Sequence, residues 1–218
     1  SFAGKCPVTV TSGPGYSLKQ EAIGLAVMGE IPLVVINVQR GGPSTGQPTK
    51  VEQGDMLTAI FGSHGDAPKV VMAVSSIEDC FYSMITARRL AETFNMVVVV
   101  LSDASLATAQ QPFPRPVFDP DWLAPPIDQN PVPEGARPYD WDPVTGIARR
   151  FSPGQPGGMH TVTGLAHDRL DQFPPQQLRR APAPRGCRGA PGSRPCWKRR
   201  PERPRARLRT RSAGPAIP

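Results

Sequence analysis

The stretch PLVVINVQRGGPSTG, residues 32–46, decides the fold class of this chain. It begins with a continuous apolar, largely β-branched run over residues 32–38, which is typical of a strand buried on both faces. It then changes abruptly into a loop of glycine, proline and hydroxyl residues that opens at Arg40. A doubly buried strand of this kind predicts the centre of a parallel sheet with helices on both faces.

The sequence on either side of this stretch alternates between strand-like and helix-like segments. Short apolar runs predict strands at residues 7–11, 32–38, 69–74 and 96–101. Helices are expected between them at residues 17–29, 51–61 and 76–95, with Ser76 as the cap of the last one. Residues 1–109 are therefore predicted to form an α/β domain with a doubly wound parallel sheet. Asp103, at the end of the fourth strand, is expected to cap a short helix.

Residues 110–168 have a different composition, crowded with proline and without a helical period. We expect this segment to wrap across a neighbouring surface on its way to a missing second domain, because it cannot pack a core of its own. Aromatic residues would anchor it, namely Phe113, Phe118, Trp122, Tyr139, Trp141 and Phe151.

The net charge of +7 reflects the C-terminal end and not the predicted domain. Residues 174–218 hold 13 of the 25 Lys and Arg residues and a single acid, Glu202. Residues 169–218 are expected to be a disordered tail rich in Arg and Pro. Their composition also matches a GC-rich gene read in the wrong frame, so a frame-shift product is a second interpretation.

The four cysteines are scattered, which favours free thiols in a reducing compartment over a disulfide framework. No signal-peptide pattern opens the chain, and the longest apolar run, residues 96–101, is too short to cross a bilayer. We therefore expect a soluble cytoplasmic protein. Neither the cysteines nor the three histidines have metal-ligand spacing, so no metal site is expected in this chain.

Two loops follow predicted strands, at the edge where ligands bind in doubly wound sheets. The first, Ser12-Gly13-Pro14-Gly15, lets the backbone turn sharply and bring its amides close to a ligand, although such a turn is as often structural. The second opens with Arg40, whose guanidinium can grip a carboxylate or phosphate in two places. The competing interpretation of Arg40 is an ion pair with an acid on a neighbouring helix.

His64 lies between glycines, in Gly62-Ser63-His64-Gly65-Asp66. A lone loop histidine is more often a solvated or capping residue than an acid–base group. We keep His64 as a second catalytic candidate because of its position just before the third predicted strand.

Together these segments resemble the alpha subunits of 2-oxoacid:ferredoxin oxidoreductases, especially those of the 2-oxoglutarate type. The resemblance covers about residues 1–168. It is carried by SGPGYSLKQE (12–21), INVQRGGPSTG (36–46), PTKVEQ (48–53), GSHGD (62–66) and, further on, PGQPGG (153–158) and TGLAHD (163–168).

The resemblance implies the pyrimidine-binding domain of a thiamine-diphosphate enzyme that oxidatively decarboxylates 2-oxoglutarate, or a related 2-oxoacid, to an acyl-CoA and reduces ferredoxin. The cofactor, with Mg²⁺, would lie between this domain and a beta subunit that also holds a [4Fe–4S] cluster, and coenzyme A would be a co-substrate. By position, Arg40 would bind the substrate carboxylate and Ser12, Gly13, Pro14 and Gly15 would line the pyrimidine side. The loop with Gly41, Gly42, Ser44 and Thr45 would shape the substrate pocket.

Two departures from the family pattern shape the expectation for this chain. The family's glutamate that binds the pyrimidine ring lies upstream of the Ser-Gly-Pro-Gly turn, beyond the first residue here, and the resemblance ends after residue 168. We therefore expect the polypeptide alone to be inactive. The alternatives are a nucleic-acid-binding protein acting through the basic tail, which has only Trp197 for base stacking, and a non-catalytic α/β scaffold.

Overall fold

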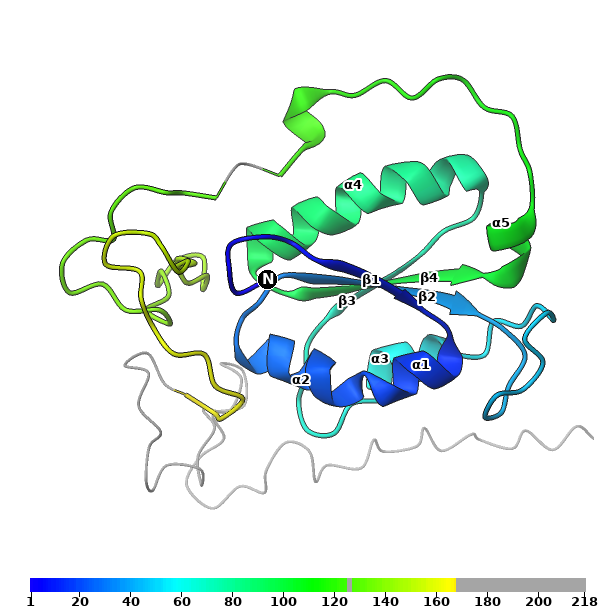
Figure 1. The fold of residues 1–218 in the computed structure, drawn as a ribbon, viewed down its shortest axis with the longest axis horizontal. Coiled ribbons are helices and arrows are strands. Elements are labelled where there is room, and N and C mark those ends of the chain that lie inside the picture. The colour runs from blue at the N-terminus through cyan, green and yellow to red at the C-terminus, as the bar shows by residue number, and fades with distance from the viewer. Residues whose placement is uncertain (125–126, 168–218) are drawn as a thin grey trace, which may run out of the picture. The chain divides into compact units, whose positions relative to one another are not determined.

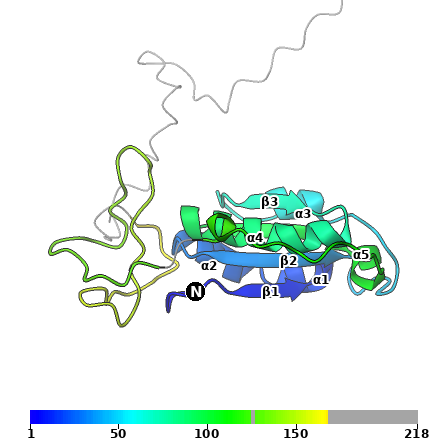
Figure 2. The same ribbon diagram turned by 90° about the horizontal axis from the view of Figure 1, so that it is seen from above.

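The computed structural model describes residues 1–124 and 127–167 of the chain. Its centre is a four-stranded parallel sheet in the order β1-β2-β4-β3, which confirms the predicted fold class (Figure 1). The strands are β1 (Val8–Thr11), β2 (Leu33–Gln39), β3 (Val70–Ala73) and β4 (Val97–Asp103). β1 and β3 are the edge strands, as Figure 2 shows, and β2 and β4 lie between them in the strand order. The expected tail, residues 169–218, lies outside the described residues.

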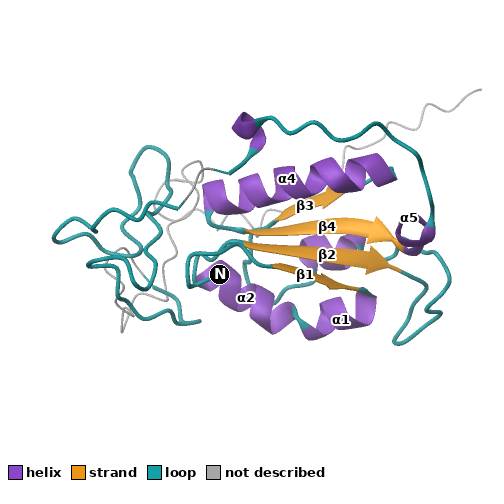
Figure 3. Ribbon diagram, turned by 45° about the horizontal axis from the view of Figure 1, so that its top comes forward, coloured by secondary structure: helices purple, strands orange, loops and turns teal. Residues whose placement is uncertain are grey.

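Helices cover both faces of the sheet (Figure 3). One face carries α1 (Gly13–Leu18), α2 (Gln20–Met28) and α3 (Met56–Phe61), and the other carries α4 (Ile77–Phe94). The short helix α5 (Ala104–Thr108) follows the end of β4. This arrangement produces two hydrophobic clusters, one around Tyr16 and Val35 and the other around Val34 and Ala87. β2 and β4 contribute to both clusters, which explains their continuous apolar sequences.

The helix ends follow local sequence signals. The Ser76 hydroxyl accepts a hydrogen bond from the Asp79 amide at 3.0 Å and caps α4, as predicted. Asp103 caps α5 in the same way, through the Leu106 amide at 3.0 Å. At the other end of α4, Asn95 adopts the left-handed conformation that ends many helices.

Two predicted helices have different limits in the structure. The expected helix over residues 17–29 is instead two helices, and the first begins at Gly13, because Pro14 fits the first helical turn without losing a hydrogen bond. The expected helix over residues 51–61 begins only at Met56. The residues just before it form no helix, since the Gln53 side chain and the Asp55 backbone N–H are hydrogen-bonded to Asp103 at the end of β4 and to Gln39 at the end of β2.

The proline-rich segment contains little regular structure in its described part. It has one short 3-10 helix, η1 (Pro120–Trp122), and one isolated bridge between Trp141 and Ala148. The Asn95 side chain donates to the Ala148 carbonyl at 2.9 Å, so the segment contacts the α/β core. The six expected aromatic anchors differ in burial. Tyr139 and Phe151 are buried, whereas the other four are partly or largely exposed. The limits predicted for the three regions of the chain stay a prediction.

Candidate functional site

The carboxyl ends of the four parallel strands meet at one edge of the sheet. The strand register pairs Thr11 of β1 with Asn37 of β2, and Gln39 of β2 with Asp103 of β4. Arg40 therefore leaves the sheet between two neighbouring strand ends. Ligands of doubly wound sheets bind at this edge, which makes it the candidate site.

The turn after β1 forms the first wall of the site. Ser12 is the N-cap of α1, and Gly13, Pro14 and Gly15 form its first turn. A Cβ atom on Gly15 would lie 2.0 Å from the Thr11 hydroxyl, and one on Gly13 would lie 3.0 Å from an Asp55 carboxylate oxygen. The side chains of Thr11 and Asp55 thus crowd the space beside these glycines, and the turn lies directly against the residue that precedes α3.

The loop after β2 forms the second wall of the site. Hydrogen bonds within its own backbone hold this loop together. The Gly41 amide donates to the Lys50 carbonyl, and the Gln47 amide donates to the Gly41 carbonyl, both at 2.9 Å. The Gly42 amide donates to the Glu52 carboxylate at 3.0 Å. We call residues 41–54 the arginine loop, after the arginine that precedes it. Gly41 is buried, whereas Gly42, Ser44 and Thr45 are exposed.

Arg40 itself is partly buried and its Nε atom has no hydrogen-bond partner in the described part of the chain. Among residues 1–124 and 127–167, no acidic side chain lies within ion-pair distance of Arg40. The competing interpretation, a structural ion pair of Arg40 with an acid on a neighbouring helix, therefore finds no acidic partner among these residues. Since buried donors in proteins are normally satisfied, an unpaired guanidinium N–H fits the binding of an anion.

A polar network lies beneath the arginine loop, and the sequence did not predict it. Asn37 donates to the Asp55 carboxylate at 3.0 Å, and the Asp55 amide donates to the Gln39 side chain at 3.0 Å. Gln53 donates to the Asp103 carboxylate at 2.8 Å. Asn37 and Gln39 are almost fully buried. Two amide side chains within an otherwise apolar strand were the available signal.

Asp103 is one of the two carboxylates in this network, with Asp55. The Leu106 backbone N–H, followed by the Gln53 side chain, lowers the pKa of the Asp103 carboxyl below its ordinary value. Asp103 therefore stays ionised at neutral pH and acts as a fixed hydrogen-bond acceptor.

His64 is not part of this cluster. It lies in the connection from α3 to the amino end of β3, and the contacts there are with the start of α2 rather than with the strand ends described above. Its Nε2 atom is 3.9 Å from the Glu21 carboxylate, and the two side chains are 82% and 88% exposed. This geometry is that of a solvated surface pair, and the catalytic role of His64 stays a prediction without structural support.

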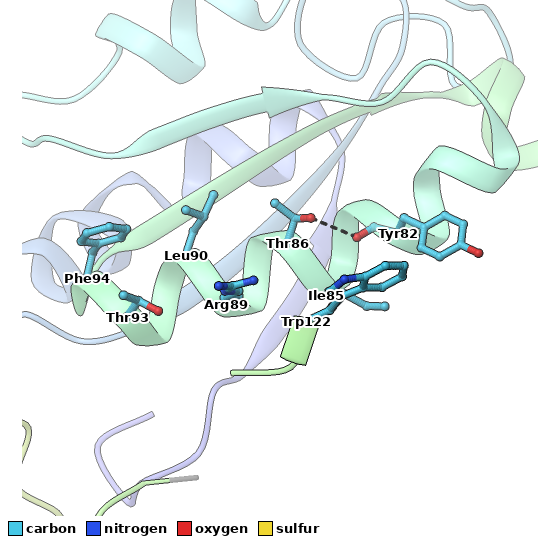
Figure 4. A pocket seen from close by; sticks show the side chains of 8 residues that line it. All are labelled: Tyr82, Ile85, Thr86, Arg89, Leu90, Thr93, Phe94 and Trp122. Carbon is cyan, nitrogen blue, oxygen red and sulfur yellow. Dashed lines mark hydrogen bonds between the residues drawn. The ribbon is translucent and has the colours of Figure 1, made fainter. Parts of the chain in front are cut away.

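A large hollow in the described structure is also separate from the strand ends. It is an open groove of about 680 Å³ on the outer side of α4, bordered by Trp122 of η1 and by Tyr82, Leu90 and Phe94 (Figure 4). Its lining is mainly apolar and brings no catalytic group together. Among the described residues, no group of three His, Cys, Asp or Glu side chains could hold a metal ion. No helix in the same part of the chain is long and apolar enough to cross a membrane.

Comparison with known proteins identifies the family. Residues 1–169 match the model of the thiamine-diphosphate-binding domain of pyruvate flavodoxin/ferredoxin oxidoreductases. The chain belongs to this family.

Relatives within this oxidoreductase family act on 2-oxoacids, according to their names. The chain is 46% identical to the 2-oxoglutarate oxidoreductase subunit KorA of Mycobacterium tuberculosis over 168 residues, which cover 76% of this chain and 25% of that protein. It is 41% identical over 168 residues to subunit alpha of 2-oxoacid:ferredoxin oxidoreductase 2 of Aeropyrum pernix, covering 76% and 26% of the two chains.

A solved structure shares the fold of this oxidoreductase domain. The chain superposes with a TM-score of 0.72 and 40% identity on 2-oxoglutarate:ferredoxin oxidoreductase from Magnetococcus marinus, solved with 2-oxoglutarate, coenzyme A and succinyl-CoA bound. The match covers 80% of this chain and 31% of that one. The chain thus spans between a quarter and a third of the length of these relatives.

Proposed function

We propose that this chain supplies the pyrimidine-side domain in the alpha subunit of a 2-oxoacid:ferredoxin oxidoreductase, with 2-oxoglutarate as the preferred class of substrate. The observation that carries the proposal is the buried, unpaired Nε of Arg40 at the carboxyl edge of the sheet. The names of the relatives, which include 2-oxoglutarate oxidoreductase and 2-oxoglutarate synthase subunits, support the substrate class.

Thiamine diphosphate is the cofactor that the family description names. Ser12, Gly13, Pro14 and Gly15 would line its pyrimidine side, since the first-turn amides of α1 lack intrahelical partners and can face a ligand. When bound, the cofactor supplies the carbon nucleophile that adds to a 2-oxoacid and accepts the electrons left by the departing carbon dioxide. We assign Mg²⁺ and a [4Fe–4S] cluster to a beta subunit, with coenzyme A as co-substrate and ferredoxin as electron acceptor.

The residues of this chain would bind and orient the substrate. Arg40 would hold the carboxylate that leaves as carbon dioxide, through charge-assisted and bidentate hydrogen bonds. Gly41, Gly42, Ser44 and Thr45 would shape the pocket around it. Because a guanidinium stays charged at all relevant pH values, this grip does not depend on a proton transfer.

A partner subunit is expected beside this site. Large apolar side chains are exposed on the helices next to the carboxyl edge, including Leu18 of α1 and Leu57 and Phe61 of α3. Large apolar side chains that stay exposed on helices of one face of a sheet are candidates for a protein interface. We propose the beta subunit as the protein that covers them. Cys6 and Cys80 are free thiols, and we propose that the protein works in the cytoplasm, where thiols stay reduced.

The test is 2-oxoglutarate-dependent reduction of ferredoxin by the complex of the alpha and beta subunits, with coenzyme A and thiamine diphosphate present. We expect turnover with 2-oxoglutarate, most of which is lost when Arg40 is changed to Met. A parent complex without turnover on any 2-oxoacid would overturn the proposal. The basic tail, on which the nucleic-acid alternative depends, lies outside the described residues, and no described feature favours that alternative.

A further inference from the structure

The arginine loop is fastened to the sheet at its base. On one side, the Asp55 amide donates to the side chain of Gln39, the residue that precedes Arg40. On the other side, the side-chain Nε2 of Gln53 donates a hydrogen bond to the Asp103 carboxylate, at the end of β4, at 2.8 Å. The second contact joins residues that are 50 positions apart in the sequence and connects the loop to a different strand.

The acceptor in this contact is rigid and charged. Asp103 is only 6% exposed, and its other oxygen is held by the Leu106 amide at 3.0 Å. Hydrogen bonds to an ionised carboxylate are stronger than those between neutral groups. Asp103 is also in register with Gln39, so the contact is made beside the strand position that immediately precedes Arg40.

We propose that Gln53 is a positioning residue for substrate binding. Its bond to Asp103 holds the arginine loop against the end of β4 and so fixes the direction in which Arg40 and the loop face the ligand. Gln53 acts through Asp103 and the loop and does not itself touch the substrate. The inference deepens the proposed function and rests on it for the role of Arg40.

A matched control lies in the same loop. Gln47 is also an exposed glutamine, and its backbone, rather than its side chain, forms the loop's hydrogen bonds. Gln53→Ala and Gln47→Ala therefore remove the same atoms from the same loop, but only the first removes the contact with Asp103. A general effect of losing a glutamine would be seen in both variants.

The first readout does not need enzyme activity. Hydrogen exchange of the loop amides can be followed by mass spectrometry on the 218-residue chain. We expect exchange over residues 41–54 to be about tenfold faster in Gln53→Ala, the factor that corresponds to one net hydrogen bond, and unchanged in Gln47→Ala. Equal exchange in the parent and in Gln53→Ala would show that the contact does not hold the loop.

The second readout is kinetic and swaps the hydrogen-bonding groups, so that residue 53 carries the carboxylate and residue 103 the amide. In Gln53→Glu two carboxylates face each other, so we expect KM for the 2-oxoacid to rise about tenfold at pH 8, with kcat and thiamine-diphosphate affinity within about twofold. The repulsion raises the pKa of the new carboxyl, so KM should recover as the pH falls and this group binds a proton. Combining Gln53→Glu with Asp103→Asn restores a donor–acceptor pair, because the new amide can donate to the carboxylate introduced at position 53 while its oxygen still caps α5.

We expect the double variant to return KM to within about threefold of the parent value, whereas a merely destabilising substitution at residue 53 would not be rescued. The two readouts separate the possible failures. A parent complex without 2-oxoacid turnover refutes the proposed function, while the exchange experiment still tests the contact. Faster loop exchange in Gln53→Ala with an unchanged KM refutes the positioning role and leaves the proposed function intact.

Discussion

Two glycine-rich loops of this protein look similar in sequence but are joined to opposite ends of their strands. The arginine loop leaves the carboxyl end of β2, and the loop with His64 enters the amino end of β3. The first is held by its own backbone and by Gln53, whereas in the second His64 makes an exposed contact with Glu21. The difference teaches that strand direction, more than residue type, decides which loop can serve a ligand in a parallel sheet.

The largest expected effect is on Arg40. In the complex with its beta subunit, Arg40→Met should lower kcat/KM for the 2-oxoacid by about 10¹–10³-fold, because losing one buried charged contact costs about 2–5 kcal/mol. Arg40→Lys should recover only part of the activity, since an ammonium lacks the planar fork. Steady-state kinetics at saturating coenzyme A and acceptor measure this, with a thiamine-diphosphate titration that should be unchanged. A Met variant within about threefold of the parent would return Arg40 to a structural role.

The next largest effect is on stability, and it is tested by replacing one glycine in each loop. Gly46 has φ +54°, and a Cβ there would lie 1.9 Å from the Gly41 carbonyl oxygen, so Gly46→Ala should lower the free energy of unfolding by about 2–4 kcal/mol. Gly65, beside His64, has φ +70° with open space around it, so Gly65→Ala should cost only about 1 kcal/mol. Urea denaturation of both variants measures the two costs. Equal costs would mean that the arginine loop is no more tightly packed than the loop with His64.

A smaller effect concerns Asp103. Asp103→Ala should destabilise the fold by about 1 kcal/mol at pH 7, because it removes the cap of α5. The folded pKa of Asp103 is lowered, so its contribution is present above the unfolded pKa of about 3.9 and is lost as the pH falls through the folded pKa.

The control for this prediction is Asp103→Asn, which keeps an oxygen for the Leu106 amide but cannot ionise there. Thermal denaturation between pH 2.5 and 7, all in the same buffer series, should show the difference between parent and Asp103→Ala shrinking toward low pH. A difference that stays constant over this range would contradict the assigned hydrogen bonds to the ionised carboxylate.

The smallest effect is expected for His64. His64→Asn should change kcat/KM by less than about twofold and the free energy of unfolding by less than about 0.5 kcal/mol, since the contact to Glu21 is exposed on both sides. Glu21→Gln is the control and should behave alike. A loss of about tenfold or more in kcat/KM for His64→Asn alone would restore His64 as a catalytic candidate and break the comparison between the loops.

The sequence predicted the sheet and its helices because their signals are local. The apolar runs of β2 and β4, the cap of α4 and the cap of α5 each depend on residues within a few positions of one another. Where the prediction was wrong, a local alternative was overlooked, as with Pro14, which starts α1 within the turn expected to precede the helix.

The candidate site could be predicted only in part. Arg40 was identified because it follows a recognisable strand, and the glycines because they mark turns. The network of Asn37, Asp55, Gln53 and Asp103 could not be predicted, because its contacts join residues 18 and 50 positions apart. Such pairs meet only when the strand order and register are known. The unpaired Nε of Arg40 likewise emerges only from the packed structure.

The most direct test of the central claim is an experimental structure of the alpha–beta complex with a 2-oxoacid bound. We predict that one substrate carboxylate lies about 2.7–2.9 Å from the Arg40 guanidinium, at the carboxyl edge of the sheet and beside residues 41–46. His64 should lie beside α2, away from the substrate. A structure in which Arg40 pairs with a protein carboxylate, and the substrate carboxylates are bound by other residues, would contradict the account.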